Sequence, residues 1–538
     1  MVRQVIMHEI VADDSIHFLS DGKTSEPFRL PEPHSGHFRF DLQGALAFYS
    51  YVAIWLLGIL LLPNQLWHKE TFNAVVLIGM IGTWRYAWWM ANLSRAGIYS
   101  RFYYPALRKK ADRVWQTGRR PEHVHFLMTT FYEEARTTHI FLDALLRELK
   151  RDGLRGTLWV GFGAKHDEEV IRQWTGRQKN PPLDIVMVRQ NQPGKRMAIG
   201  IILRALSRHG VGKDDIAYLM DGDSILGEGV LQKTISIFEA EPDVGAMTTN
   251  EEAVVMGPKW VEKWLIMRFA QRRMWMQSHA LSKRVLTLTG RMSAYRAHLI
   301  VDKEFIRTVE ADELRHWLWG NFRFLSGDDK STWYTLLKRR INMLYIPDAM
   351  VYTIEYIEGN GVRRMVENLM RWSGNMLRNG MRAIMLGPKT VSPFIWWCLI
   401  DQRIAIWTVL IGFTTSMAVS LFIDHSFIFT YILWIMFTRM VMSMALFCFS
   451  DRIRISYPLF LYINQLFSAF VKVYILFRLP RQRWSNRQGQ TGGGDAMNSR
   501  SKRLIAMYIN LLYIFLMLFC VCLVTGILQW PKYYQLIF

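Results

Sequence analysis

Long apolar segments constrain the fold of this sequence more than any other feature. A helix needs about 20 apolar residues to cross a bilayer, and it is the form that satisfies its own backbone there. Five runs meet this description: residues 42–62, 75–93, 404–423, 427–449 and 504–528. We therefore expect an α-helical membrane protein.

The distribution of Lys and Arg predicts how these segments are oriented. Residues 63–70 carry one lysine, whereas residues 95–120 carry many Lys and Arg. By the positive-inside rule, the cap at 1–41 and the chain after residue 93 lie in the cytoplasm. A further apolar run, 457–479, would place the basic loop at 478–503 outside if it crossed fully. We predict an interfacial or partly inserted helix there.

Between the second and third apolar runs, the sequence has the texture of an α/β domain. Short apolar runs alternate with amphipathic segments, as in βαβ units. The expected strands are 124–130, 157–162, 184–189 and 216–220, and the intervening helices include 144–150 and 197–207. The predicted organisation is a cap (1–41), two transmembrane helices (42–93), the α/β domain (94–390), two transmembrane helices (391–449), an interfacial helix with a basic loop (450–503), and a last transmembrane helix with a short C-terminus (504–538).

Composition narrows the class of partner. The chain has a formal net charge of +21 but is 51% hydrophobic, with 29 Met and 21 Trp. A soluble nucleic-acid-binding protein would carry the charge without the apolar runs, so we expect a lipid bilayer and no nucleic acid. The four cysteines, Cys398, Cys448, Cys520 and Cys522, lie in apolar segments without zinc-site spacing.

Two basic stretches rich in Trp and Met, 259–277 and 361–385, have helical spacing. Such helices suit a membrane interface, with their arginines toward phosphate groups and their apolar face inward. The alternative is an ordinary surface helix packed on its own domain.

The predicted strand at 216–220 runs into two carboxylates, Asp221 and Asp223, separated by one glycine. In open α/β sheets, ligands bind at the carboxyl ends of the strands. Two oxygen ligands there suit Mg²⁺ or Mn²⁺ held against a diphosphate. The alternative is a solvated turn, because Asp and Gly form turns by their own chemistry.

Further polar groups follow in an informative order. They are the strand-end run Thr129–Glu134, the cations Lys195 and Arg196 for binding phosphates, a second acidic turn at Ser326–Lys330, and the pair Arg371–Trp372. Their order and spacing are more specific than any single piece.

In this order, the motifs resemble those of the processive membrane glycosyltransferases of family 2, the relatives of cellulose, hyaluronan and chitin synthases. The resemblance extends from residue 42 onward and implies a GT-A-type, Rossmann-like domain. It implies that the donor contacts Thr130, Tyr132 and Glu133, and that Asp221 and Asp223 bind the metal.

The same resemblance assigns the remaining roles. It implies Asp329 as catalytic base, with Asp328 and Lys330 shaping it, and an acceptor site at Arg371 and Trp372. Asn368 stands where the family motif has glutamine, and Gly161–Gly163 replaces an Asp-Asp-Gly motif. Trp484 and Arg487 resemble a gating loop of hyaluronan synthases.

A narrower resemblance, to catalytic subunits of bacterial alginate synthases, rests on residues 268–272, 280–293 and 326–331. It implies GDP-mannuronate as donor, a growing polysaccharide as acceptor and a partner subunit that binds cyclic-di-GMP. The implied location is the bacterial inner membrane, with a cytoplasmic catalytic domain. The alternatives are a β-glycan synthase using a UDP-sugar such as UDP-glucose, a transferase acting on a lipid phosphate, and a transporter with a vestigial domain.

The chemistry of such a reaction is simple to state. A sugar hydroxyl is a poor nucleophile, so a carboxylate must accept its proton. Cations must neutralise the departing diphosphate, and one displacement inverts the anomeric carbon.

Cations within the apolar runs predict a polyanionic product. Arg85, Arg403, Arg439 and Lys472 lie in or beside these segments, where charge is costly and marks a substrate path. The alternative is local pairing, for example of Arg403 with Asp401.

Overall fold

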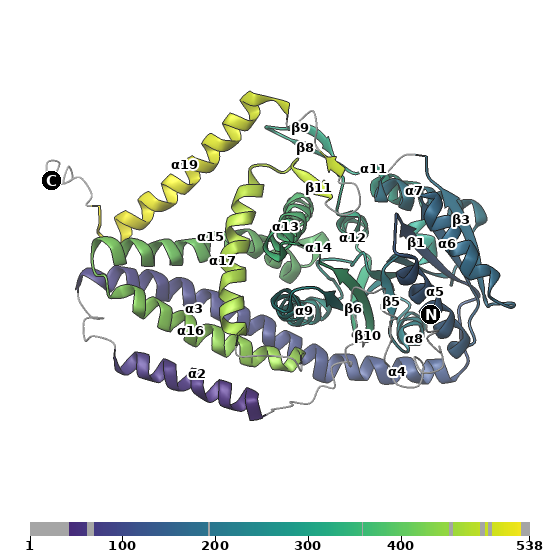
Figure 1. The fold of residues 1–538 in the computed structure, drawn as a ribbon, viewed down its shortest axis with the longest axis horizontal. Coiled ribbons are helices and arrows are strands. Elements are labelled where there is room, and N and C mark those ends of the chain that lie inside the picture. The colour runs from purple at the N-terminus through teal and green to yellow at the C-terminus, as the bar shows by residue number, and fades with distance from the viewer. Residues whose placement is uncertain are drawn as a thin grey trace, which may run out of the picture.

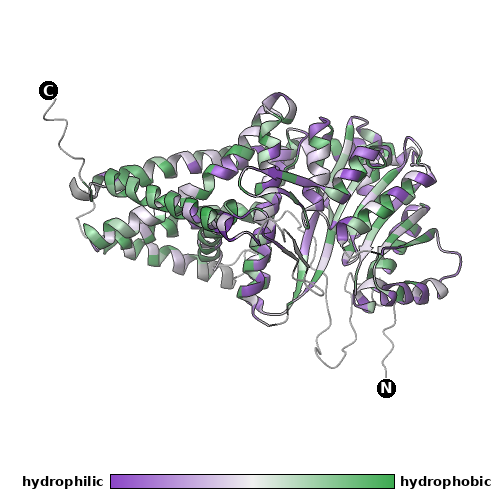
Figure 2. Cartoon of the chain, turned by 90° about the horizontal axis from the view of Figure 1, so that it is seen from above, coloured by the Kyte–Doolittle hydropathy of each residue, from purple (hydrophilic) through white to green (hydrophobic). Residues whose placement is uncertain are grey.

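The computed structural model describes residues 42–61, 69–191, 194–357, 359–450, 456–484, 490–492 and 498–528. Figure 1 shows a sheet domain at one end of the molecule and long helices at the other. In Figure 2 the helical end is almost uniformly hydrophobic, whereas hydrophobic and hydrophilic residues alternate through the sheet domain. The predicted α/β domain between apolar helices is therefore observed.

An eight-stranded mixed sheet forms the centre of the α/β domain. In spatial order the strands are β3 (Leu183–Arg189), β2 (Gly156–Phe162), β1 (Val124–Thr130), β4 (Ile216–Asp221), β7 (Met292–Arg296), β6 (Val244–Met256), β10 (Asn342–Tyr356) and β5 (Ser224–Leu226). The first four are parallel, β7 runs antiparallel to both neighbours, and β10 is parallel to β6. All four predicted strands, 124–130, 157–162, 184–189 and 216–220, are present within one residue at each end.

The helices of this domain bury one apolar face each. In α5 (Ala135–Asp152), Leu142, Leu145 and Leu149 recur at helical spacing and are fully buried. The helix ends at Gly153, whose φ of 62° gives the left-handed turn that stops helices. The other helices are α4 (Tyr104–Gln116), α6 (Lys165–Gly176), α7 (Lys195–His209), α8 (Val230–Ala240), α10 (Ala297–Ile300), α11 (Lys303–Ala311) and α12 (Asp328–Lys338).

Strand order brings the polar strand ends together. β1 lies between β2 and β4, and the register sets Thr129 opposite Asp221. After β1, the chain places β2 and β3 on one side of that strand and then crosses over to place β4 on its other side. This reversal of strand order opens a crevice at the carboxyl ends of β1 and β4.

Within the described chain, four helices are long and apolar enough to cross a membrane. They are α15 (Pro393–Phe422), α16 (Phe427–Leu446) with its continuation η3 (Phe447–Phe449), α17 (Tyr457–Leu476) and α19 (Arg500–Val524). The predicted spans at 404–423, 427–449 and 504–528 lie on α15, α16 with η3, and α19, and α15 begins 11 residues before its predicted span.

The first two predicted spans form helices but differ in character. α2 (Leu42–Leu60) contributes a shorter apolar stretch, Phe48–Leu60. α3 (Lys69–Ile98) carries Arg85 and Arg95 and continues through the short π-helix η2 (Tyr99–Tyr103) into α4. α3 is as long as α15 but is not among the four candidates, and only the shorter stretch of α2 is apolar among the described residues, so the spans at 42–62 and 75–93 stay predictions.

The prediction that α17 is an interfacial or partly inserted helix also stays a prediction. Its length and apolarity suffice for a crossing, yet in Figure 1 its axis runs across those of α15 and α16. Two small hairpins flank it, β8 (Glu313–His316) with β9 (Gly320–Arg323), and β11 (Gln482–Trp484) with β12 (Gln490–Gly492).

The two predicted interface helices are α9 (Lys259–Ala280) and α13 (Gly361–Met385). α9 packs against α3, β6 and α17, and most of its residues are buried, so its role as an interface helix stays a prediction. Its arginines turn inward instead, and Arg273 forms a buried ion pair with Glu252 at 2.5 Å. α13 packs on α12, α15 and α17 and leads through the short α14 (Pro388–Val391) into α15. Both helices join the sheet domain to the apolar helices.

Candidate active site

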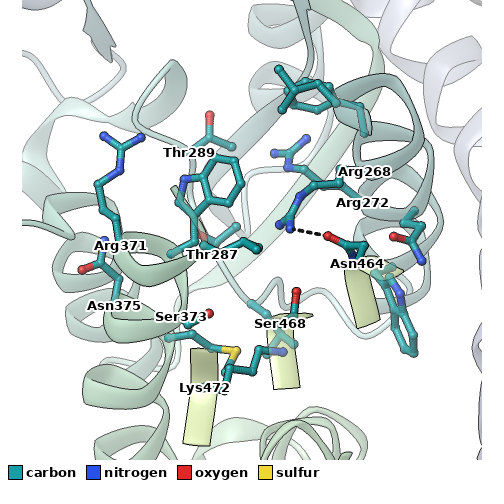
Figure 3. A pocket seen from close by; sticks show the side chains of 18 of the residues that line it. Arg268, Arg272, Thr287, Thr289, Arg371, Ser373, Asn375, Asn464, Ser468 and Lys472 are labelled. Carbon is teal, nitrogen blue, oxygen red and sulfur yellow. Dashed lines mark hydrogen bonds between the residues drawn. The ribbon is translucent and has the colours of Figure 1, made fainter. Parts of the chain in front are cut away.

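A cavity of about 1310 Å³ connects the sheet domain with the apolar helices. At one end it is lined by the strand-end residues Asp221 and Asp223, and at the other by Tyr431 and Arg439 of α16. Between these ends it passes α9, α13 and α17. Ten of the side chains along this middle part are labelled in Figure 3, where they converge on the cavity from three sides.

The first acidic turn lies directly beside the end of β1. The Gly222 N–H donates to the Thr129 carbonyl at 3.2 Å. A Cβ at Gly222 would lie 3.1 Å from that same carbonyl oxygen, so a side chain there would crowd the turn. Glycine therefore lets Asp221 and Asp223 lie at the carboxyl end of β4, where both line the cavity.

Lys195 joins the two acidic turns. Its Nζ lies 2.6 Å from Asp221 Oδ1 and 3.0 Å from Asp328 Oδ2. Burial lowers the pKa of Lys195, but the two carboxylates outweigh it and hold the pKa above its ordinary value. Gly290 approaches the same spot, since a Cβ there would lie 3.4 Å from Lys195 Nζ and 3.5 Å from Asp221 Oδ2.

The second acidic turn begins α12. Gly327 has a φ of 83°, and Asp328 and Asp329 form the first turn of the helix. Burial raises the pKa of Asp329, and the neighbouring Asp328 charge raises it further. Burial acts in the same direction on Asp328, but Lys195 and Arg196 reverse it and lower the pKa of Asp328. Two adjacent carboxyls with opposite shifts are typical of a base beside a fixed charge.

Arg196 is part of the protein interior and does not line the cavity. It is 5% exposed, and its guanidinium donates to the carbonyls of Val309 and Ser326 and to Ser331 Oγ at 2.8–3.1 Å. Arg196 was predicted to contact the donor, but its side chain does not reach the cavity surface. Arg196 instead fixes the chain on both sides of Gly327.

The strand-end run is held by a residue that the sequence did not single out. Asp167 accepts hydrogen bonds from the backbone N–H groups of Tyr132 and Glu133 at 2.9 and 3.0 Å. Tyr132 has a φ of 50°, which is strained for a non-glycine residue and marks a constrained site. Thr130, Tyr132 and Glu133 all line the cavity, as predicted donor contacts must.

The acceptor residues predicted on α13 divide into two groups. Arg371 and Trp372 line the cavity, whereas Asn368 is buried behind them and accepts from Arg371 at 3.2 Å. Trp372 stacks on Trp264, with ring centroids 6.2 Å apart, and Arg268 lies 4.5 Å from its centroid. Asn368 therefore supports Arg371 and does not face a ligand.

An ion-pair network on the cavity wall was missed by the sequence analysis. Glu251 binds Arg272 at 3.0 Å and Arg291 at 3.4 Å, and Arg291 also binds Glu355 at 3.0 Å. Burial raises the pKa of Glu251, but these arginines outweigh it and lower the pKa. Two consecutive acidic residues, Glu251 and Glu252, lie within the long strand β6, and this pattern in the sequence could have indicated buried ion pairs.

The predicted gating loop lies mostly outside the described residues. The backbone of Trp484 ends β11, while Arg487 and the Trp484 side chain are not described. Gln482 of the same strand accepts from the Leu325 N–H at 2.9 Å, next to the second acidic turn. The role of this loop stays a prediction.

The chain was compared with known proteins. Residues 122–375 match the family described as "Glycosyltransferase like family 2". The chain is 38% identical to glycosyltransferase alg8 of Pseudomonas syringae pv. tomato, over 79% of this chain and 86% of that protein. It belongs to the alg8 family of glycosyltransferases.

Another relative is similar over most of its length. Glycosyltransferase alg8 of Azotobacter vinelandii is 35% identical over 84% of this chain and 91% of that protein. Among solved structures, mannosyltransferase PcManGT from Pyrobaculum calidifontis, in complex with GDP-Man and Mn²⁺, aligns over 74% of this chain and all of its own, with 15% identity and a TM-score of 0.42. The predicted family 2 glycosyltransferase is confirmed for this alg8 family member, and its matched region contains the predicted α/β sheet domain.

The residues around the first acidic turn fit a divalent cation shared with a diphosphate. Among the described residues, no three His, Cys, Asp or Glu side chains converge as a complete metal site. Asp221 and Asp223 offer two carboxylates at a cavity wall. Mg²⁺ binds through one or two carboxylates and takes further ligands from substrate phosphates.

Proposed function

We propose that this glycosyltransferase polymerises mannuronic acid from GDP-mannuronate, inverts the anomeric carbon and passes the growing alginate chain across the membrane. One observation carries the proposal. The acidic reaction centre opens into a cavity that continues between α9, α13, α15, α16 and α17, and is lined along the way by cations.

Asp329 is the proposed base. It lines the cavity at the first turn of α12, and its raised pKa gives it more affinity for a proton than Asp328 has. A base with a pKa nearer the working pH accepts the proton of a sugar hydroxyl more readily. Asp328, fixed by Lys195, positions the turn.

The donor diphosphate is proposed to bind beside Asp221 and Lys195. A divalent cation, Mg²⁺ or Mn²⁺, would be held by Asp221 and Asp223 and would neutralise charge on the leaving diphosphate. Lys195 supplies a cation from the chain itself at the same place. Thr130, Tyr132 and Glu133 border the part of the cavity where the nucleoside would lie.

The membrane half of the cavity supports a polyanionic product. Arg85, Arg439 and Lys472 line it, whereas Arg403 does not and instead donates to the Leu377 carbonyl at 2.7 Å. Asp401 pairs with Arg85, so the alternative of local pairing holds for Arg85 and not for Arg403. Arg439 donates to the Tyr86 hydroxyl at 2.8 Å.

The remaining parts of the proposal follow from the family. We place the enzyme in a bacterial inner membrane with its catalytic domain in the cytoplasm, acting with a partner subunit that binds cyclic-di-GMP. Support comes from the relatives named glycosyltransferase alg8 and from the apolar helices.

The test is a comparison of donors. Membranes containing the protein are incubated with GDP-mannuronate and, separately, with UDP-glucose, each radiolabelled in the sugar. Polymer from GDP-mannuronate that an alginate lyase degrades is the expected result. Polymer from UDP-glucose alone would contradict the proposed donor and leave a family 2 polymerase using a neutral sugar.

A further inference from the structure

A polar stripe runs along one face of the otherwise apolar helix α17. Asn464, Ser468 and Lys472 are spaced by four residues, so they lie one above another on the same face. All three line the cavity, and Figure 3 shows Ser468 and Lys472 along its lower edge. Side chains that cost free energy in an apolar helix are thus gathered where a substrate would pass.

Arg268 of α9 faces this stripe. Its guanidinium donates to Asn464 Oδ1 at 3.4 Å and lies 4.5 Å from the ring centroid of Trp372. Arg268 and Lys472 line the same cavity, from α9 and α17 respectively. Burial lowers the pKa of Arg268 to about 10, which still leaves it charged at neutral pH.

Neither cation has a carboxylate partner among the ion pairs of the described residues. Nearby arginines are neutralised: Arg272 pairs with Glu251 at 3.0 Å, and Arg85 pairs with Asp401. Two like charges on the wall of one cavity repel each other and lose hydration, and an anion bound in that cavity offsets both costs. The ligand that complements Arg268 and Lys472 in this cavity therefore carries a negative charge.

The place of this pair in the cavity identifies the ligand. Arg371 and Trp372 line the cavity together with Asp329, and Trp372 contacts Arg268. Lys472 lines the same cavity from the apolar helix α17. A chain that leaves the proposed base through this cavity toward the apolar helices passes these groups.

We propose that Arg268 and Lys472 bind the carboxylate of a uronate residue in the acceptor chain, so that this subsite selects a polyuronate over a neutral glycan. The inference rests on the proposed function and deepens it, because it assigns the recognition of the acid group to two residues. Asn464 and Ser468 supply hydrogen bonds to hydroxyl groups of the same or the adjoining sugar.

The test measures acceptor binding without donor, using the purified full-length protein in detergent. The probes are a β-1,4-linked tetramannuronate and the neutral β-1,4-linked tetramannose of equal length. Wild type should bind the tetramannuronate more tightly. Arg268→Gln and Lys472→Met should each weaken that binding by about tenfold or more, as expected when a charged hydrogen-bond partner is lost, and leave tetramannose binding unchanged.

Two kinds of control separate charge from structure. Arg268→Lys and Lys472→Arg keep the charge and should retain the preference for the uronate. Lys165→Met, at an exposed position of α6 paired with Glu169, should change neither affinity. Equal losses for both oligomers, or no loss in either variant, would overturn the inference.

The same proteins distinguish this inference from the proposed function. Release of GDP from GDP-mannuronate reports on the donor site and does not depend on acceptor selectivity. If wild type fails to use GDP-mannuronate but discriminates the two oligomers through Arg268 and Lys472, the proposed donor is wrong and the subsite stands. If GDP is released and alginate forms, but the variants bind both oligomers like wild type, the function stands and the subsite is wrong.

Discussion

The two halves of the cavity have opposite electrostatics. At the sheet, four aspartates of the two acidic turns line the wall, and Lys195 pairs with two of them, Asp221 and Asp328. At α17, Arg268 and Lys472 line the wall without an acidic partner in the described part of the chain. A divalent cation with its nucleotide complements the first region, and a carboxylate complements the second. The acidic half therefore suits a cationic ligand, and the basic half suits an anionic one.

The largest effect is expected at the base. Asp329→Asn should lower turnover by about 10²–10⁴-fold, because an amide cannot accept the acceptor's proton. Binding of the sugar nucleotide should persist, since Asp329 does not belong to the donor turn. Polymer formation and nucleotide affinity are measured on the same preparation, and turnover near that of wild type would exclude Asp329 as base.

A smaller effect, on binding, is expected at the first acidic turn. Asp223→Ala should weaken GDP binding about 10- to 100-fold in the presence of Mg²⁺ or Mn²⁺, the loss of one charged contact. Without divalent cations the variant and wild type should bind GDP alike. Equal affinities under both conditions would show that the metal is held elsewhere.

The pH dependence of turnover should reveal the coupling within the second turn. The base works deprotonated, so turnover falls as the pH drops through the raised pKa of Asp329. Asp328→Asn removes a like charge that raises this pKa, and the acid limb should move down by about one pH unit. Turnover is measured across the acid range at saturating donor, and an upward shift would contradict the assignment of the two carboxyls.

The smallest effect on catalysis is expected for substitution of Arg85. This experiment distinguishes cations that stabilise the fold from cations that contact the polymer. Its partner Asp401 has a side chain that is 7% exposed. Arg85→Met leaves this carboxylate buried and unpaired, which costs about 3–5 kcal/mol. Thermal unfolding in detergent should show the loss, and Arg85→Met with Asp401→Leu should recover most of it. Unchanged stability with slower polymerisation would instead make Arg85 a polymer contact.

The sequence predicted best those parts of the molecule that depend on local pattern. The strand at 216–220, the two acidic turns and the helix at 361–385 follow from periodicity and turn chemistry, and the structure has them at those positions. Arg371 and Trp372 also lie on the cavity wall as expected.

The rest depends on distances between residues remote in sequence. Arg85 pairs with Asp401, 316 positions away, although Arg403 was nearer along the chain. Arg196 follows Lys195 directly, but helix geometry turns its side chain away from its neighbour's, into the interior. The spacing of Asn464, Ser468 and Lys472 was readable, but the position of Arg268 beside them was not.

Lys195 has a consequence for timing. A polymerase that adds one sugar per cycle must hold its chain during the interval in which spent nucleotide leaves and fresh donor arrives. Mobile counterions depart with the nucleotide, whereas Lys195 is covalently attached and lies within 3.0 Å of both acidic turns. The carboxylates therefore do not repel one another during that interval, and the turn that carries Asp329 keeps its position. For the proposed polymerisation, the reaction centre therefore keeps its arrangement between one sugar and the next, whatever the time between two donors.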